Sequence, residues 1–103
     1  DAVALLVKAL DERPRDEVLL FALGVLHEKR GEAEQAIARM RQVLAVNPLN
    51  ASALNFIGYT WAELGQNLDE AEALIRKALE LNPDNGAYVD SLGWVLYKKG
   101  DYP

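Results

Sequence analysis

Few side chains in this sequence could serve as a catalytic nucleophile or base. The 103 residues include one histidine, His27, two serines, Ser52 and Ser91, and no cysteine. A Ser-His-Asp arrangement would therefore need His27 as its base. In the internal repeat described below, His27 takes a position that Trp61 and Leu96 fill in the other units, so we interpret it as a packing residue. We expect no enzymatic activity from this chain.

The other residues that could carry chemistry also have a structural explanation. Asp69, Glu70 and Glu72 fall in the first turn of an expected helix, where carboxylates favour the positive end of the helix dipole. The spacing of Gly58 and Gly65 lacks the Gly-Lys-Ser/Thr ending of a phosphate-binding loop. No EF-hand or histidine spacing indicates a metal site. The sequence therefore predicts neither a cofactor nor a bound metal ion.

Composition excludes further classes of partner and site. The net charge is −5, and the lysines and arginines are scattered, which argues against nucleic-acid binding. The absence of cysteine excludes disulfides and thiolate metal sites from this sequence. No apolar run approaches the roughly 18 residues of a membrane span. We expect no direct insertion into a membrane.

The elements that position these residues repeat along the chain. Three sets of residues recur with a spacing of 34 and then 35 positions: Gly24, Gly58 and Gly93; Gly31, Gly65 and Gly100; and Pro14, Pro48 and Pro83. Residues before a proline are pushed out of the helical region, so each proline marks the end of a helix. A shared period in this range is typical of stacked helical repeats.

Apolar periodicity and capping residues together predict six helices. The expected helices span residues 1–12, 17–30, 33–46, 51–64, 68–81 and 86–99. Asp16, Asn50 and Asn85 have the position and chemistry of N-caps. Asn67 and Glu70 have the spacing of a capping box. Short connections between the helices favour antiparallel pairs.

At these positions the sequence resembles the tetratricopeptide repeat (TPR), whose pattern is W-x2-L-G-x2-Y, then A-x3-F, then P. The first complete unit follows it at Leu20, Leu23, Gly24, His27, Ala36, Met40 and Pro48. The second follows it at Leu54, Ile57, Gly58, Trp61, Ala71, Ile75 and Pro83. The third begins at Val89, Leu92, Gly93 and Leu96. The sequence departs from the consensus at the first pattern position, which is not Trp, at His27, and by one extra residue near Leu68. We interpret these departures as size changes at packing positions, which leave the fold prediction intact.

The resemblance implies an all-α fold: a TPR solenoid of helical hairpins, with about six antiparallel helices in a right-handed superhelix. The whole chain, residues 1–103, is then one fragment of an array. Residues 1–16 would be the second helix of a preceding repeat, 17–50 and 51–85 two repeats, and 86–103 the first helix of a following repeat. Gly24 should face Ala36, and Gly58 should face Ala71, so that the two helices of each repeat approach closely.

A second stripe of residues on the first helices of the repeats has no role in packing the pairs. In the TPR family these positions line a concave groove, and here they are Phe21, Val25, Asn55, Tyr59, Asp90, Trp94, Tyr97 and Lys98. Packing against a neighbouring helix is the other explanation for each aromatic ring. Because several aromatic residues share the stripe, we favour a groove that binds a segment of a partner protein or peptide. The alternative is a structural spacer in a longer TPR protein with no peptide binding of its own.

One subfamily of TPR domains holds the C-terminal Glu-Glu-Val-Asp tail of heat-shock chaperones with Lys, Arg and Asn side chains. The corresponding positions here are Phe21, Val25, Phe56, Ala87 and Ser91, so this clamp is absent. The segment 82–97 also resembles bacterial cell-envelope TPR lipoproteins, some of which act as adaptors. That narrower resemblance favours a bacterial source and the periplasm or cell envelope, with the cytoplasm as the alternative.

The ends of the chain carry an expectation of their own. The last helix lacks a following partner helix, so we expect Val89, Leu92, Val95 and Leu96 to be partly uncovered. Exposed apolar patches tend to find a partner. The sequence therefore predicts possible self-association through the truncated ends of the array.

Overall fold

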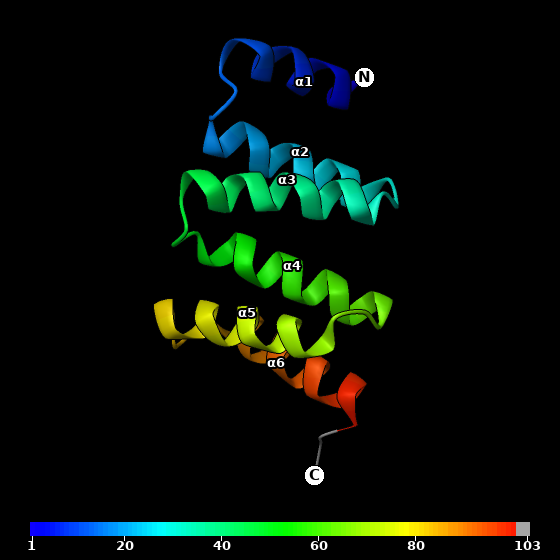
Figure 1. Ribbon diagram of the computed structural model, residues 1–103, viewed down its shortest axis with the longest axis vertical. Helices are drawn as coiled ribbons and strands as arrows, with labels where there is room; N and C mark the ends of the chain where they lie inside the picture. Colours follow the sequence, from blue (N-terminus) through cyan, green and yellow to red (C-terminus); the bar gives the residue numbers. More distant parts are fainter. Residues whose placement is uncertain (101–103) are drawn as a thin grey trace. The chain divides into compact units, whose positions relative to one another are not determined.

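The computed structural model describes residues 1–100, and residues 101–103, the end of the predicted segment 86–103, lie outside the described residues. The described part contains six helices and no strand (Figure 1). In chain order they are α1 (Ala2–Glu12), α2 (Glu17–Lys29), α3 (Ala33–Val46), α4 (Ala51–Leu64), α5 (Leu68–Leu81) and α6 (Gly86–Lys99). The all-α prediction and the six predicted helices are confirmed.

The predicted N-caps start their helices as expected. Carboxylate or amide oxygens of Asp16, Asn50 and Asn85 accept hydrogen bonds from backbone N–H groups three residues ahead, at 3.0, 3.0 and 3.1 Å. Asp1 also caps rather than joins its helix, because its carboxylate accepts from the backbone N–H of Ala4 at 2.8 Å. These bonds satisfy amide groups that no helix can pair internally.

The predicted capping box at the start of α5 is wrong. Asn67 lies in the left-handed region at φ 48° and makes no side-chain capping bond. In that backbone conformation Asn67 continues the turn that follows Gly65, which itself has φ 69°. Asp69 and Glu70 remain in the first turn, where they favour the helix dipole.

Residues 1–48 form one compact unit, in which α2 packs against α3 and α1 packs against α2. The α2–α3 hairpin buries Leu23 and Met40 completely. A Cβ atom added to Gly24 would lie 2.8 Å from Cε of Met40 and 3.4 Å from the carbonyl oxygen of Ala36. The predicted proximity of Gly24 and Ala36 is confirmed.

Residues 49–100 form the second unit, in which α4 packs against both α5 and α6. A Cβ atom on Gly58 would lie 2.6 Å from Cγ1 of Ile75 and 2.8 Å from the carbonyl oxygen of Ala71. The predicted contact between Gly58 and Ala71 is therefore confirmed. It leaves no room for a side chain.

The third repeat glycine does not follow the other two. A Cβ atom on Gly93 would meet nothing within 4 Å among the described residues. On the same helix Val89 is 52% exposed, whereas Leu92 and Leu96 are half-buried. The expectation that Val95 is uncovered is wrong, because Val95 is completely buried. Val95 follows Gly93 by two residues, which turns it to the other side of the helix, where α4 and α5 pack.

An ion cluster holds the end of α6 against the start of α5. Nζ of Lys99 lies 2.8 Å from Oδ1 of Asp69 and 2.8 Å from Oε1 of Glu72. Nε of Arg76 lies 2.7 Å from the other carboxylate oxygen of Glu72. Hydrogen bonds from Lys99 and then Arg76 lower the pKa of Glu72, and the bonds to Asp69 and Glu72 raise the pKa of Lys99. The cluster fixes the part of α6 that carries the candidate site.

Candidate protein-binding surface

Three of the predicted groove residues form one group on the last turns of α6. The rings of Trp94 and Tyr97 are stacked, with centroids 5.6 Å apart and an angle of 15° between their planes. Nζ of Lys98 lies 5.4 Å from the centroid of Trp94, which places the ammonium group over the indole. Tyr97 is 54% exposed, while Trp94 is half-buried. The group therefore presents one exposed aromatic ring and one cation to solvent.

The indole N–H of Trp94 has no hydrogen-bond partner among the described residues, although it is buried. The same is true of the amide oxygen Oδ1 of Asn55 on α4. A buried donor or acceptor without a partner costs about 1–3 kcal/mol. Such groups are few in native proteins, and each requires an explanation. These two are the most informative polar atoms of the surface.

The remaining predicted residues of the second unit follow or precede Asn55 and Trp94 along α4 and α6. Tyr59 follows Asn55 by one helical turn and is 44% exposed. Asp90 precedes Trp94 by one turn and is exposed. Because α4 and α6 pack against each other, the α4 residues and the α6 group belong to neighbouring helices. We refer to Asn55, Tyr59, Asp90, Trp94, Tyr97 and Lys98 as the α4–α6 surface.

One contact that fixes the two helices was not predicted. The hydroxyl groups of Ser52 on α4 and Tyr88 on α6 lie 3.1 Å apart, and Tyr88 is only 6% exposed. The bond joins residues 36 positions apart in the sequence. Nothing in the local pattern of either helix indicates it.

The remaining two predicted groove residues belong to the first unit. Phe21 and Val25 lie on α2, one turn apart, and both are half-buried. The other six predicted residues belong to the second unit, so a single groove containing all eight stays a prediction.

The candidate catalytic residues have structural partners. Nδ1 of His27 lies 2.9 Å from Oε1 of Glu32, with 12% of the histidine side chain exposed. Hydrogen bonding by His27 lowers the pKa of Glu32. Ser91 donates its hydroxyl to the backbone carbonyl of Ala87 at 3.0 Å, and Ser52 pairs with Tyr88. These contacts fit the interpretation of His27 as a packing residue.

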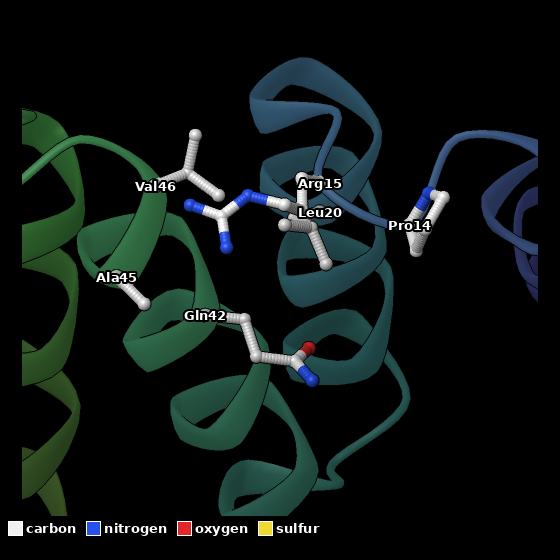
Figure 2. A pocket seen from close by; sticks show the side chains of 6 residues that line it. All are labelled: Pro14, Arg15, Leu20, Gln42, Ala45 and Val46. Carbon is white, nitrogen blue, oxygen red and sulfur yellow. The ribbon is translucent and has the colours of Figure 1, made fainter.

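A small pocket lies in the first unit, between the α1–α2 connection and the ends of α2 and α3. Figure 2 shows the guanidinium group of Arg15 directed toward Val46, with Gln42 on the other side of the hollow. Pro14 and Leu20 complete much of the lining. The pocket holds no carboxylate, histidine or nucleophile, so we assign no chemistry to it.

Within residues 1–100, no group of three or more His, Asp or Glu side chains is arranged to bind a metal ion. No helix in that range is both long and apolar enough to cross a membrane.

Comparison with protein families places the sequence among helical repeats. The family profile described as Tetratricopeptide repeat matches residues 21–86 and 66–103. A TPR repeat-containing protein of Pseudomonas aeruginosa is 43% identical over 93 residues, which cover 90% of this chain and 16% of the relative. Photosystem I assembly protein Ycf3 of Rippkaea orientalis is 32% identical over 100 residues, covering 84% of this chain and 57% of that protein. The chain therefore spans only part of either relative.

A similar fold occurs in a solved structure, the first TPR of Spaghetti (RPAP3) bound to an HSP90 peptide. Its TM-score is 0.89 at 22% identity, and the match covers 96% of this chain and 78% of the other. At that identity the likeness shows the fold alone. The predicted TPR architecture is thereby confirmed.

Proposed function

Because the chain belongs to the tetratricopeptide repeat family, a family of protein-interaction scaffolds, we propose that it is a non-catalytic adaptor that binds a segment of a partner protein on the α4–α6 surface. The observation that carries the proposal is the aromatic group on α6. Trp94, which is half-buried, stacks on the exposed ring of Tyr97 with Lys98 over the indole, so one helix offers both an apolar and a cationic contact. Aromatic anchors of this kind supply much of the binding energy at protein interfaces.

The two unpaired polar atoms support a peptide as the bound group. The indole N–H of Trp94 is a donor, and Oδ1 of Asn55 is an acceptor. A peptide backbone offers both a carbonyl acceptor and an N–H donor. The exposed Tyr97 and Lys98 side chains cover the indole and would rotate to admit the segment. Binding would then relieve the cost of leaving these atoms without partners.

Charges at the edge of the surface would set the direction of the segment. Asp90 and Lys98 are both exposed and lie on opposite sides of Trp94 along α6. Complementary charges contribute more to specificity and association rate than to affinity. The proposed partner therefore carries a basic group near Asp90 and an acidic group near Lys98.

The residues at the clamp positions argue against one class of adaptor, the proteins that bind chaperone tails. The RPAP3 structure holds an HSP90 peptide, but at the clamp positions this chain has Phe21, Val25, Phe56, Ala87 and Ser91. It therefore lacks the cations and amides for an acidic chaperone tail. The name of the Rippkaea orientalis relative describes an assembly protein, which fits an adaptor role.

Peptide selection tests the proposal without knowledge of the natural partner. A random-peptide phage library is panned on the wild-type chain, and enriched peptides are synthesised and titrated. We expect Trp94→Ala to lower their affinity about 30-fold or more, which corresponds to about 2 kcal/mol at a hot spot. The control is Leu81→Ala, which truncates an exposed apolar residue at the end of α5 and should leave the affinity unchanged.

A second variant separates the indole N–H from the aromatic ring. Trp94→Phe keeps an apolar ring on α6 and removes the donor, so it should lose less affinity than Trp94→Ala. If no peptide is enriched, or if the selected peptides bind Trp94→Ala as well as wild type, the chain acts as a spacer in this region and the proposed surface is wrong.

A further inference from the structure

The pocket of the first unit lacks a catalytic group, but it has the size of a binding site for one side chain (Figure 2). Its volume is about 160 Å³. Pockets for cofactors and drug-sized ligands are larger, roughly 300 to 1,000 Å³. An apolar cavity of roughly 150 Å³ accommodates a benzene ring. The pocket therefore has room for one apolar side chain and not for a whole cofactor.

Short side chains leave this space open between the α1–α2 connection, α2 and α3. Ala45 on α3 takes the repeat position of Glu80 on α5, three residues before the recurring proline in each case. Leu20 on α2 stands where the repeat pattern has the larger Trp. Leu20 is 2% exposed and so lies at the bottom of the pocket, whereas Ala45 is exposed at its edge. The apolar part of the lining is therefore open to solvent on one side only.

Both polar side chains of the lining are hydrogen-bond donors. Figure 2 shows the guanidinium group of Arg15 directed across the pocket toward Val46. Among residues 1–100, no carboxylate pairs with this guanidinium. The amide oxygen of Gln42 accepts from Nη1 of Arg39 at 3.2 Å, which leaves its amide nitrogen as a donor. A carboxylate is the acceptor that best matches a guanidinium group, because it can accept two parallel hydrogen bonds.

A second hollow, on α5, lacks this free cation. It is lined by Arg76, Leu79, Glu80 and Pro83. Arg76 already pairs with Glu72 at 2.7 Å, and Glu80 adds a negative charge to the lining. A carboxylate would be repelled there, so the combination of an apolar space and an unpaired arginine distinguishes the pocket of the first unit.

We propose that the pocket of the first unit binds a segment of a partner protein in which an apolar side chain, of the size of leucine or phenylalanine, adjoins an acidic residue. The apolar side chain lies against Leu20, Ala45 and Val46, and the acidic residue pairs with Arg15. Burial of the apolar side chain supplies most of the affinity. The charge pair contributes mainly to specificity. This site belongs to the first unit, and it does not depend on the α4–α6 surface, which belongs to the second.

A subtractive peptide selection tests the proposal. A random-peptide phage library is first depleted on Ala45→Glu and then panned on wild type. The depletion variant carries the residue that α5 has at the same repeat position, so it should fold while its side chain fills the pocket and repels a carboxylate. It also retains the α4–α6 surface, so peptides that bind there are removed. We expect the enriched peptides to contain a leucine or phenylalanine next to an aspartate or glutamate.

Two arginine variants test the charge pair. Arg15→Met should lower the affinity of the enriched peptides about tenfold, as for an arginine at a hot spot. The matched control is Arg13→Met, which removes the same charge from an exposed side chain outside the pocket lining and should bind like wild type. Exchanging the acidic residue of the peptide for its amide should weaken binding to wild type by the same factor. It should change nothing further on Arg15→Met, because the two groups act as a pair.

Ala45→Leu separates volume from charge, because it fills the pocket with an uncharged side chain at an exposed helical position. It should lower the affinity at least as much as Arg15→Met. The proposal is overturned if no peptide is enriched after depletion, or if the enriched peptides lack an acidic residue. It is also overturned if Arg15→Met binds as tightly as Arg13→Met, or if Ala45→Leu binds like wild type.

Discussion

The α2–α3 and α4–α5 hairpins share one backbone plan but bring their helices together differently. Gly58 lies against the backbone carbonyl of Ala71 and the branched side chain of Ile75. Gly24 meets the flexible end of Met40, and its nearest backbone atom, the carbonyl oxygen of Ala36, is farther away at 3.4 Å. The repeat therefore determines the position of the glycine in each hairpin. The residues that the glycine contacts on the second helix determine whether a larger side chain can be accommodated there.

The turns of the two hairpins differ in the same way. The backbone N–H of Glu32 donates to the carbonyl of His27 at 2.9 Å, and that of Gln66 donates to Trp61 at 3.0 Å. The side chains then diverge, because His27 pairs with Glu32, whereas Trp61 is 5% exposed in the core. One turn contains a titratable contact, and the other relies on apolar burial.

The largest expected effect comes from removing the buried ring of the second hairpin. Trp61→Ala leaves a cavity in the core around α4 and should lower the free energy of unfolding by about 3–5 kcal/mol. His27→Ala should cost less, because its smaller side chain buries less apolar area. Chemical denaturation of both variants measures the difference. Equal losses would show that His27 is as central to packing as Trp61.

The next largest effect on stability is expected at the close contact of Gly58. Gly58→Leu should destabilise by about 1–3 kcal/mol or more through overpacking, and the gain in helix propensity returns roughly 1 kcal/mol at most. A melting temperature at or above that of wild type would mean that Gly58 is not at a close contact.

Alanine substitutions sharpen the comparison between the two glycines. Gly58→Ala should destabilise, because the backbone of Ala71 cannot yield as a side chain does. Gly24→Ala should change stability little, because the end of Met40 can move and the helix propensity improves. Equal melting temperatures for the two variants would remove the distinction between the hairpins.

The smallest expected effect is on the pH dependence of the first hairpin. In this hairpin the hydrogen bond between Glu32 and His27 lowers the pKa of Glu32 below the ordinary value of 4.5. The contribution of a carboxylate with a lowered pKa is present above that value and is lost as the pH falls through its folded pKa. Glu32→Gln should therefore lower the melting temperature at neutral pH and have little effect once Glu32 is protonated.

Gln66 provides the control for this titration. It occupies the position of Glu32 in the second hairpin and cannot lose a proton, so any effect of Gln66→Ala should be the same at neutral and acidic pH. A Glu32→Gln effect that persists unchanged in acid would contradict the assigned role of the carboxylate.

Most of the fold could be predicted because its signals are local. Asp16, Asn50 and Asn85 cap helices through bonds to residues three positions ahead, and the recurring prolines follow the helix ends. The grouping of Trp94 with Tyr97 follows from helical spacing in the same way. Asn67 was assigned wrongly because the spacing of a capping box does not reveal a left-handed backbone.

The polar details of the site depend on distances that the sequence does not contain. The sequence does not show that the polar atoms of Asn55 and Trp94 are buried without partners, and the bond between Ser52 and Tyr88 depends on the packing of α4 against α6. These residues are separated by a full repeat along the chain, so no local pattern relates them. The exposed position of Gly93 likewise depends on which helices are present beside α6.

The two tryptophans allow a direct test of the proposed binding surface. Each indole N–H gives its own signal in a nitrogen–proton correlation NMR spectrum, one for Trp61 in the core and one for Trp94 on α6. On titration with a selected peptide, we predict that the Trp94 indole signal shifts strongly, because its unpaired N–H gains an acceptor, while the Trp61 signal stays in place. A shift of Trp61 with an unchanged Trp94 would contradict the α4–α6 surface as the binding site.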